Sequence, residues 1–113
     1  MFVHDWTCTP DHVGTMAAAK LSDDLTRLIF EPIELFRGDE PAWVTGKITD
    51  GCFMYTTRTG RLLMLWSNFG EGGYCEAIAS SENGRLDGKW RQEKQPIFAR
   101  GMAGDYDGGH GMI

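Results

Sequence analysis

The sequence lacks the features that mark membrane, secreted and nucleic-acid-binding proteins. No apolar run approaches the roughly 18 residues that a membrane helix requires. The first residues, Met-Phe-Val-His-Asp-Trp, contain neither the basic segment nor the apolar core of a signal peptide. With 11 basic and 16 acidic residues the net charge is −5, and no cluster of Lys or Arg exceeds a pair. We therefore expect a cytoplasmic chain without membrane or nucleic-acid partners.

Paired cysteines are also lacking. Cys8, Cys52 and Cys75 are odd in number and fit no metal-binding spacing such as Cys-x-x-Cys. An odd set without such spacing argues against a disulfide framework and against a zinc site. We expect reduced and mostly buried thiols.

What the sequence does contain is a series of short apolar runs between turn-forming clusters. Its 113 residues fit one domain, and glycine is abundant at 15 residues. Glycine-rich turns between short aromatic and β-branched runs are typical of an all-β chain. The runs predict seven strands, at Phe2–Trp6, Thr15–Leu21, Ile33–Phe36, Phe53–Thr57, Leu62–Trp66, Tyr74–Ala79 and Ile97–Ala99.

Two tight turns are predicted between these strands. Arg58-Thr59-Gly60 joins the runs on either side into a hairpin, with glycine at the left-handed position. Glu82-Asn83-Gly84 is a second candidate turn. The first of these turns places glycine where a positive φ is needed.

One segment has a competing helical interpretation. Met16–Phe30 opens with Ala17-Ala18-Ala19-Lys20, which has good helix propensity. We favour a strand that ends at Leu21, because Ser22-Asp23-Asp24 then forms a polar turn. Residues 15–19 would pair back on the N-terminal strand.

The chain also resembles itself at long range. Glu31–Phe36 is echoed by Lys94–Phe98, so that Pro96 follows Pro32 by 64 residues, and Phe2–Trp6 is echoed by Leu65–Phe69. A repeat of three or four strands is the signature of a propeller blade, although repeating blades usually span about 40–50 residues. This predicts an all-β chain of about two four-stranded antiparallel propeller blades, incomplete unless oligomerisation completes it.

The repeat divides a single partial propeller domain, residues 1–113, into three parts. Residues 1–39 form a blade that lacks its inner strand. Residues 49–100 form a complete blade, with strands near 52–57, 62–67, 74–80 and 96–99. Residues 107–113, with three glycines around His110 and then Met112-Ile113, begin the inner strand of a next blade and need a partner there.

A set of motifs makes the chain similar to a known family. They are Ile48-Thr49-Asp50-Gly51-x-Phe53-x-Tyr55, Thr59–Gly70, Gly73-Tyr74, Ser81-Glu82-x-Gly84 and Asp107–Ile113, together with Leu21–Thr26 and Glu31–Phe36 upstream. The combination resembles glycoside hydrolase family 43, the arabinanases, arabinofuranosidases and β-xylosidases built on a five-bladed β-propeller. The similarity extends over nearly the whole chain and implies arabinan or xylan oligosaccharides as the partner.

The resemblance implies inverting hydrolysis by two carboxyl groups, roughly 6.5–9.5 Å apart, with a third acid that tunes the general acid. The family's general acid lies in a Glu-Gly-Pro or Asp-Gly-Pro segment, which corresponds to Asp50-Gly51-Cys52, so Asp50 is the candidate general acid. The shorter Asp50 reaches less far than glutamate, and Cys52 replaces a rigid proline. The base and the tuning acid would lie upstream of Met1, so we expect the lone chain to be weak or inactive.

Further site residues follow from the resemblance. His110 would lie near the propeller axis and support a cation, such as structural calcium, or a water cluster, although no cofactor is required. An imidazole is a weak ligand for hard cations. Aromatic rings can stack on sugars, and of four candidates we expect Trp6 or Trp43 rather than Trp66 or Phe69 to be exposed for binding. The candidate substrate-binding residues are His4, Asp5, Trp6, Trp43 and His110.

Structural roles compete with these assignments. Asp50 is also suited to a turn in which it caps Gly51, and His110 to hydrogen bonding among backbone groups. His4 and Asp5 are also suited to a polar rim at a strand end. Glu71 and Glu76 are interpreted as solvated charges near a strand start.

Two non-catalytic functions remain open. In the first, residues 107–113 of one copy fill the vacant inner position of the next, in a dimer or trimer closed by head-to-tail strand exchange. Such pairing would cover exposed sheet edges. In the second, the chain is a carbohydrate-binding module, which would bind sugar without turnover.

Overall fold

The computed structural model describes residues 2–3, 5 and 9–113 of the chain. The described part contains seven β-strands and no helix, so no helix long and apolar enough to span a membrane is found there. The all-β class expected from the sequence is confirmed. The strands are β1 (Phe2–Val3), β2 (Thr15–Ala18), β3 (Ile33–Arg37), β4 (Asp50–Thr56), β5 (Leu62–Gly70), β6 (Gly73–Ser81) and β7 (Trp90–Gln92).

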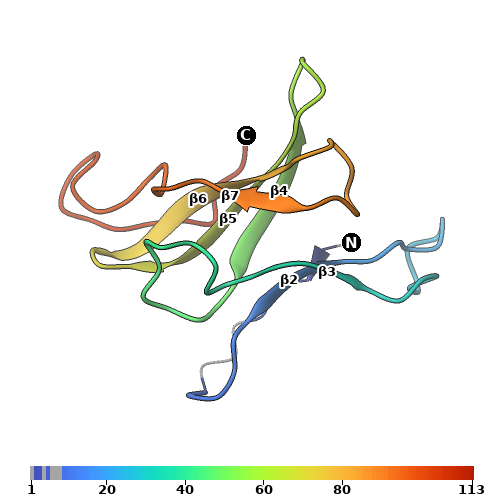
Figure 1. The fold of residues 1–113 in the computed structure, drawn as a ribbon, viewed down its shortest axis with the longest axis horizontal. Helices are drawn as coiled ribbons and strands as arrows, with labels where there is room; N and C mark the ends of the chain where they lie inside the picture. Colours follow the sequence, from blue (N-terminus) through green and yellow to red (C-terminus); the bar gives the residue numbers. More distant parts are fainter. Residues whose placement is uncertain (1, 4, 6–8) are drawn as a thin grey trace.

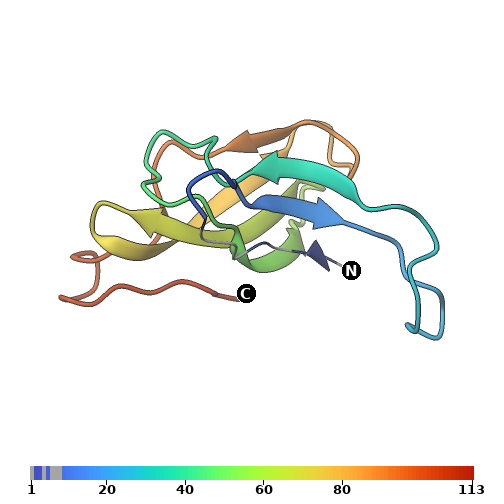
Figure 2. The same cartoon turned by 90° about the horizontal axis from the view of Figure 1, so that it is seen from below.

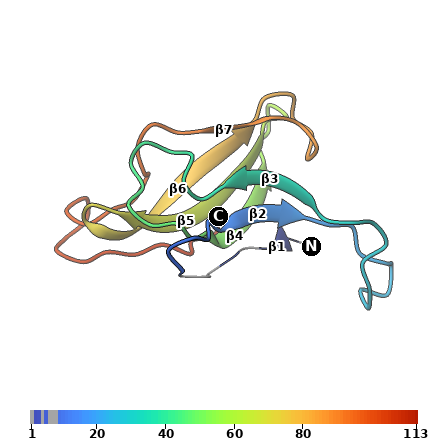
Figure 3. The same cartoon turned by 60° about the horizontal axis from the view of Figure 1, so that its bottom comes forward.

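The strands form two open antiparallel sheets, with orders β1-β2-β3 and β4-β5-β6-β7 (Figures 1 and 3). The hairpin between β4 and β5 closes as expected, since the Gly60 N–H donates to the Thr57 carbonyl and Gly60 has φ 81°. The turn after β6 likewise has Gly84 at φ 73°. Glycine therefore supplies the left-handed residue in both predicted turns.

The helical alternative for residues 16–30 is wrong. β2 pairs with β1 on one side and β3 on the other, with a bulge between Met16 and Ala17. The loop after β2 is the expected polar turn, in which the Leu25 N–H donates to the Ser22 carbonyl. The helix propensity of the alanines is outweighed here by burial, because Met16 and Ala18 are buried at alternate positions of a strand.

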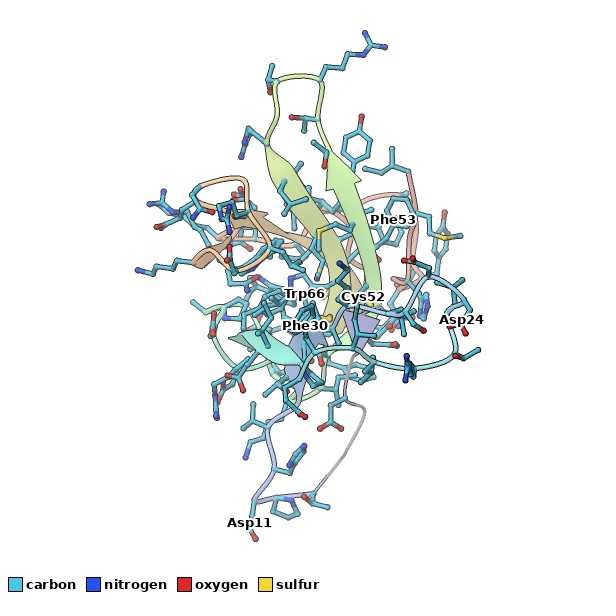
Figure 4. The ribbon with its side chains drawn as sticks, turned by 90° about the vertical axis from the view of Figure 1, so that its right-hand side faces the viewer. Asp11, Asp24, Phe30, Cys52, Phe53 and Trp66 are labelled. Atoms are coloured by element: carbon cyan, nitrogen blue, oxygen red, sulfur yellow. The ribbon has the colours of Figure 1, made fainter. Side chains whose placement is uncertain are left out.

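One core joins the two sheets. Trp66 on β5 is 0% exposed, and its ring centroid lies 5.0 Å from Phe36 on β3 and 5.8 Å from Trp43. Figure 4 places Trp66 in the interior, whereas Asp11 and Asp24 lie on peripheral loops. The buried members of the core are Met16, Phe36, Met64, Trp66, Ala77, Ala79 and Trp90.

The outer strand does not lie near residues 96–99, where the sequence predicted it. The outer strand is β7, which pairs with the end of β6, and Phe98 makes an isolated bridge to Glu76. Trp90 takes the outer position because its ring is buried against Phe36, with centroids 6.2 Å apart. Pro96 lacks the N–H that a continuous ladder needs, so pairing is interrupted before Phe98.

The last segment, residues 107–113, is irregular and forms no strand. It returns beneath the four-stranded sheet, as Figure 2 shows. Its prediction as the inner strand of a further blade stays a prediction. Cys52 and Cys75 are free thiols, half-buried and buried, as expected, whereas Cys8 lies outside the described residues.

Candidate active site

Asp50 is the first residue of β4, and it is 9% exposed. Its Oδ1 accepts a hydrogen bond from the Gly51 N–H at 2.8 Å, and its Oδ2 accepts one from the Tyr74 hydroxyl at 2.5 Å. The Nδ1 atom of His110 lies 3.6 Å from Oδ1. Asp50 thus caps Gly51, as the structural interpretation expected, and also faces two further polar side chains.

The local backbone explains how His110 reaches Asp50. Register shifts between Asp50 and Phe53 relative to β5, and Gly51 has φ 60°. A Cβ at Gly51 would lie 2.8 Å from the Cα of His110. Glycine is therefore required both for the conformation of this bulge and for the close approach of the last segment.

Tyr74, near the start of β6, holds the other oxygen of Asp50. Burial raises the pKa of Tyr74, and its hydrogen bond to the Asp50 carboxylate raises it further. The phenol therefore remains a donor over the whole neutral range. It fixes the orientation of the carboxyl group that the resemblance nominates as the general acid.

Glu76 is a buried member of the site that the sequence interpretation missed. It was expected to be a solvated charge, but it is 5% exposed. Its Oε2 accepts hydrogen bonds from the Ser67 hydroxyl at 3.0 Å and from the Gly111 N–H at 2.8 Å. No local pattern indicated its burial, because its neighbours Cys75 and Ala77 project from the opposite face of β6.

Residues 107–111 lie on this cluster through hydrogen bonds to β5 and β6. The His110 N–H donates to Ser67 Oγ at 2.7 Å, and the Gly108 N–H donates to the Tyr74 carbonyl at 3.1 Å. Asp107 accepts from the Tyr74 N–H at 2.9 Å, which is the leading cause that lowers the pKa of this exposed carboxyl. The side chain of His110 is 64% exposed, so its imidazole faces solvent beside Asp50.

Asp5 also lies beside the start of β4. Its carbonyl accepts from the Thr49 N–H and its N–H donates to Thr49 Oγ1, both at 2.9 Å. Its carboxylate contacts His12 Nε2. Asp5 is therefore next in space to the residue that precedes Asp50, whereas His4 and Trp6 lie outside the described residues.

Trp43 occupies a different part of the molecule. It is half-buried against Trp66 and lines a cavity of about 520 Å³ together with Cys75 and the turn at residues 70–73. Asp5, Asp50 and His110 are not among the lining residues of that cavity. The structure therefore does not bring Trp43 together with the cluster around Asp50.

The cluster around Asp50 offers few ligands for a cation. Within residues 2–3, 5 and 9–113, no three or more His, Cys, Asp or Glu side chains lie together as metal ligands. His110 and Asp50 alone offer one imidazole and one carboxylate, whereas calcium takes six to eight oxygen ligands. These residues do not make a calcium site by themselves, and the structural cation stays a prediction.

Comparison with solved structures gives one informative match. The endo-arabinase from Bacteroides thetaiotaomicron VPI-5482 superposes with a TM-score of 0.72 and is 32% identical, over 77% of this chain and 34% of the arabinase chain. No protein-family profile and no curated protein matches the chain. The two open antiparallel sheets are thus similar to propeller blades of that arabinase, and this chain spans about a third of its length.

Proposed function

We propose that the chain is part of an arabinan-acting glycosidase of the glycoside hydrolase family 43 type, with Asp50 as its general acid. The observation that carries this proposal is the buried Asp50 carboxyl at the start of β4, held by the Tyr74 hydroxyl and flanked by His110. The 32% identity to an endo-arabinase supports the choice of arabinan among plant polysaccharides.

In the proposed reaction Asp50 donates a proton to the oxygen of the leaving sugar as the glycosidic bond breaks. The Gly51 N–H and the Tyr74 hydroxyl hold the carboxyl group while the proton moves. A base on the opposite face of the sugar activates water, and inversion follows. We propose that the base comes from a part of the propeller beyond the matched third, so the lone chain is weak or inactive.

The test compares Asp50→Asn with Asp39→Asn. Asp39 is exposed and ion-paired with Arg37 in a loop, so it is a matched control for loss of a carboxylate. Calorimetry with arabino-oligosaccharides and xylo-oligosaccharides measures binding, and release of reducing ends from arabinan measures turnover. Loss of a general acid is expected to lower turnover roughly 10²–10⁴-fold with binding retained.

Three outcomes separate the candidates. Turnover lost only in Asp50→Asn supports the proposal. Wild-type turnover in Asp50→Asn, or no binding of either oligosaccharide by the wild-type chain, contradicts it. Binding without turnover in any variant, even when azide is added as a substitute for the water that the missing base would activate, favours a carbohydrate-binding module.

Self-association is a second candidate property, favoured by apolar side chains on the surface. Phe30, Met112 and Ile113 are each more than half exposed. We propose that copies associate as a dimer or trimer in which residues 107–113 pair with the neighbouring copy. Light scattering should then give twice or three times the chain mass, and Ile113→Asp should shift it toward monomer while Glu93→Gln does not. A stable wild-type monomer would refute the assembly.

A further inference from the structure

We infer that Glu76 is a positioning residue, whose buried carboxylate anchors residues 109–111 and thereby holds His110 beside Asp50. Its consequence for catalysis rests on the proposed function of Asp50, whereas the anchoring itself does not. Glu76 is 5% exposed and covered by the last segment, so it does not reach a substrate.

The sheet places Glu76 and Asp50 at the two ends of one row. Asp50 on β4 pairs with Ser67 on β5, and Ser67 pairs with Glu76 on β6. Cross-strand partners of this kind project from the same face of a sheet. The row therefore carries a carboxylate, a hydroxyl and a second carboxylate across three adjacent strands.

The last segment docks on this row through consecutive backbone donors. The His110 N–H donates to Ser67 Oγ at 2.7 Å, and the Gly111 N–H donates to Glu76 Oε2 at 2.8 Å. Ser67 in turn donates its hydroxyl hydrogen to Glu76 Oε2 at 3.0 Å. Glu76 is thus the final acceptor for both contacts, one direct and one through Ser67.

Steric contacts make the docking close. A Cβ at Gly109 would lie 2.5 Å from Ser67 Oγ and 2.7 Å from the ring of Tyr74. His110 itself has φ 62°, a left-handed conformation that non-glycine residues seldom adopt without support. The hydrogen bonds on either side of His110 supply that support and fix the direction in which its imidazole leaves the backbone.

The charge of Glu76 argues for a specific role. Burying a carboxylate is costly unless hydrogen bonds compensate it, and Glu76 Oε1 is buried without a hydrogen-bond partner among the described residues. An apolar residue would pack in this position of β6 at lower cost. What the carboxylate adds is an acceptor for Gly111 and Ser67.

The test measures amide hydrogen exchange by NMR in the whole chain. Glu76→Leu removes the acceptor, so exchange at the Gly111 and His110 amides should rise at least tenfold. Glu76→Gln should restore most of the protection, because its amide oxygen accepts the same two bonds. Ser67→Ala should raise exchange at His110 while Gly111 stays protected. Glu71→Gln, in the exposed turn before β6, is the control and should change neither amide.

The NMR signals of the His110 ring separate a positioning role of Glu76 from an effect on overall stability. The ring resonances of His110 should move toward those of a free histidine in Glu76→Leu and return in Glu76→Gln. Unchanged exchange and unchanged ring resonances in Glu76→Leu would overturn the inference. If Glu76→Leu does not fold, the Ser67→Ala and Glu76→Gln results decide it, since full protection of His110 in Ser67→Ala contradicts the relay.

The turnover assay and the hydrogen-exchange experiments distinguish this inference from the proposed function. If Asp50→Asn keeps wild-type turnover, Asp50 is not the acid, yet the exchange data on Glu76 still decide the anchoring. If the exchange data are negative while Asp50→Asn loses turnover, the general acid stands and the positioning role fails.

Discussion

The two sheets of this molecule differ in how firmly their strands are paired. β5 and β6 run in register over eight residue pairs, from Leu63↔Ser80 to Gly70↔Gly73. In the three-stranded sheet the strands have only two to five residues, although a bulge interrupts both sheets, in β2 and in β4. Asp50, Ser67, Tyr74 and Glu76 all belong to the four-stranded sheet, so the candidate site is built on the better-paired half. Rigid strands hold polar groups more accurately than loops do.

The largest expected loss of stability comes from truncating Trp66, which belongs to one sheet and packs against the other. Trp66→Ala empties the centre of the core, next to Phe36 and Trp43, and should cost about 3–5 kcal/mol of unfolding free energy. Phe30→Ala, an exposed aromatic beside the three-stranded sheet, should change it by less than about 0.5 kcal/mol. Urea unfolding measures both, and equal losses would contradict a single shared core.

A matched pair of methionines tests whether the sheets unfold together. Met16 on β2 and Met64 on β5 are both completely buried. Each substitution by alanine should cost about 2–5 kcal/mol, because each leaves a cavity in the same core. Fluorescence and circular dichroism should report one coincident transition in both variants. Two separate transitions in Met16→Ala would mean that the three-stranded sheet melts independently.

A smaller difference in unfolding free energy is expected between alanine substitutions at two glycines with positive φ. Gly51→Ala meets the His110 backbone at 2.8 Å, whereas an added Cβ at Gly60 has open space around it. Gly60→Ala should therefore cost only the left-handed conformation, about 1–2 kcal/mol, and Gly51→Ala should cost more. Thermal unfolding measures the difference, which disappears if the last segment does not contact Gly51.

The smallest expected effect is a pH dependence from Tyr74. Burial, followed by the bond to Asp50, raises the pKa of Tyr74 above the value near 10 of an unfolded tyrosine. Above about pH 10 the unfolded chain therefore binds fewer protons than the folded chain, and stability falls as pH rises. The stability that Tyr74 contributes is fully present below that pH.

Tyr74→Phe should flatten this alkaline decline, and Tyr106→Phe on an exposed loop should not. Denaturant unfolding between about pH 8 and 11 measures it. An alkaline decline that is identical in Tyr74→Phe would contradict the assigned environment of the phenol.

Much of the fold was predictable because it follows local rules. Short apolar runs located β4, β5 and β6, and turn-forming clusters with glycine located the turns at Gly60 and Gly84. β7 was missed because Trp90-Arg91-Gln92 is too short to show a period, while the apolar Ile97-Phe98 pair gave the stronger local signal. Which of two short segments pairs with β6 is decided by packing against Phe36, a tertiary contact.

The site was predictable only in part. The motif around Asp50 identified one carboxyl group, and the glycines around His110 indicated a segment that needs a partner. In the structure His110 lies against Gly51. Glu76 was missed because a charged side chain was assumed to face water. Its burial depends on residues 109–111 folding over β6, and no local pattern contains that contact.

The order of the contacts made by the last segment has a mechanical consequence. A force applied at Ile113 would load the bond from Gly111 to Glu76 first, then that from His110 to Ser67, and only later those of Gly108 and Asp107 to Tyr74. The bonds would then be loaded one after another rather than together. The segment would peel rather than shear, and His110 would swing away from Asp50 while Asp107 still tethers the chain to the sheet.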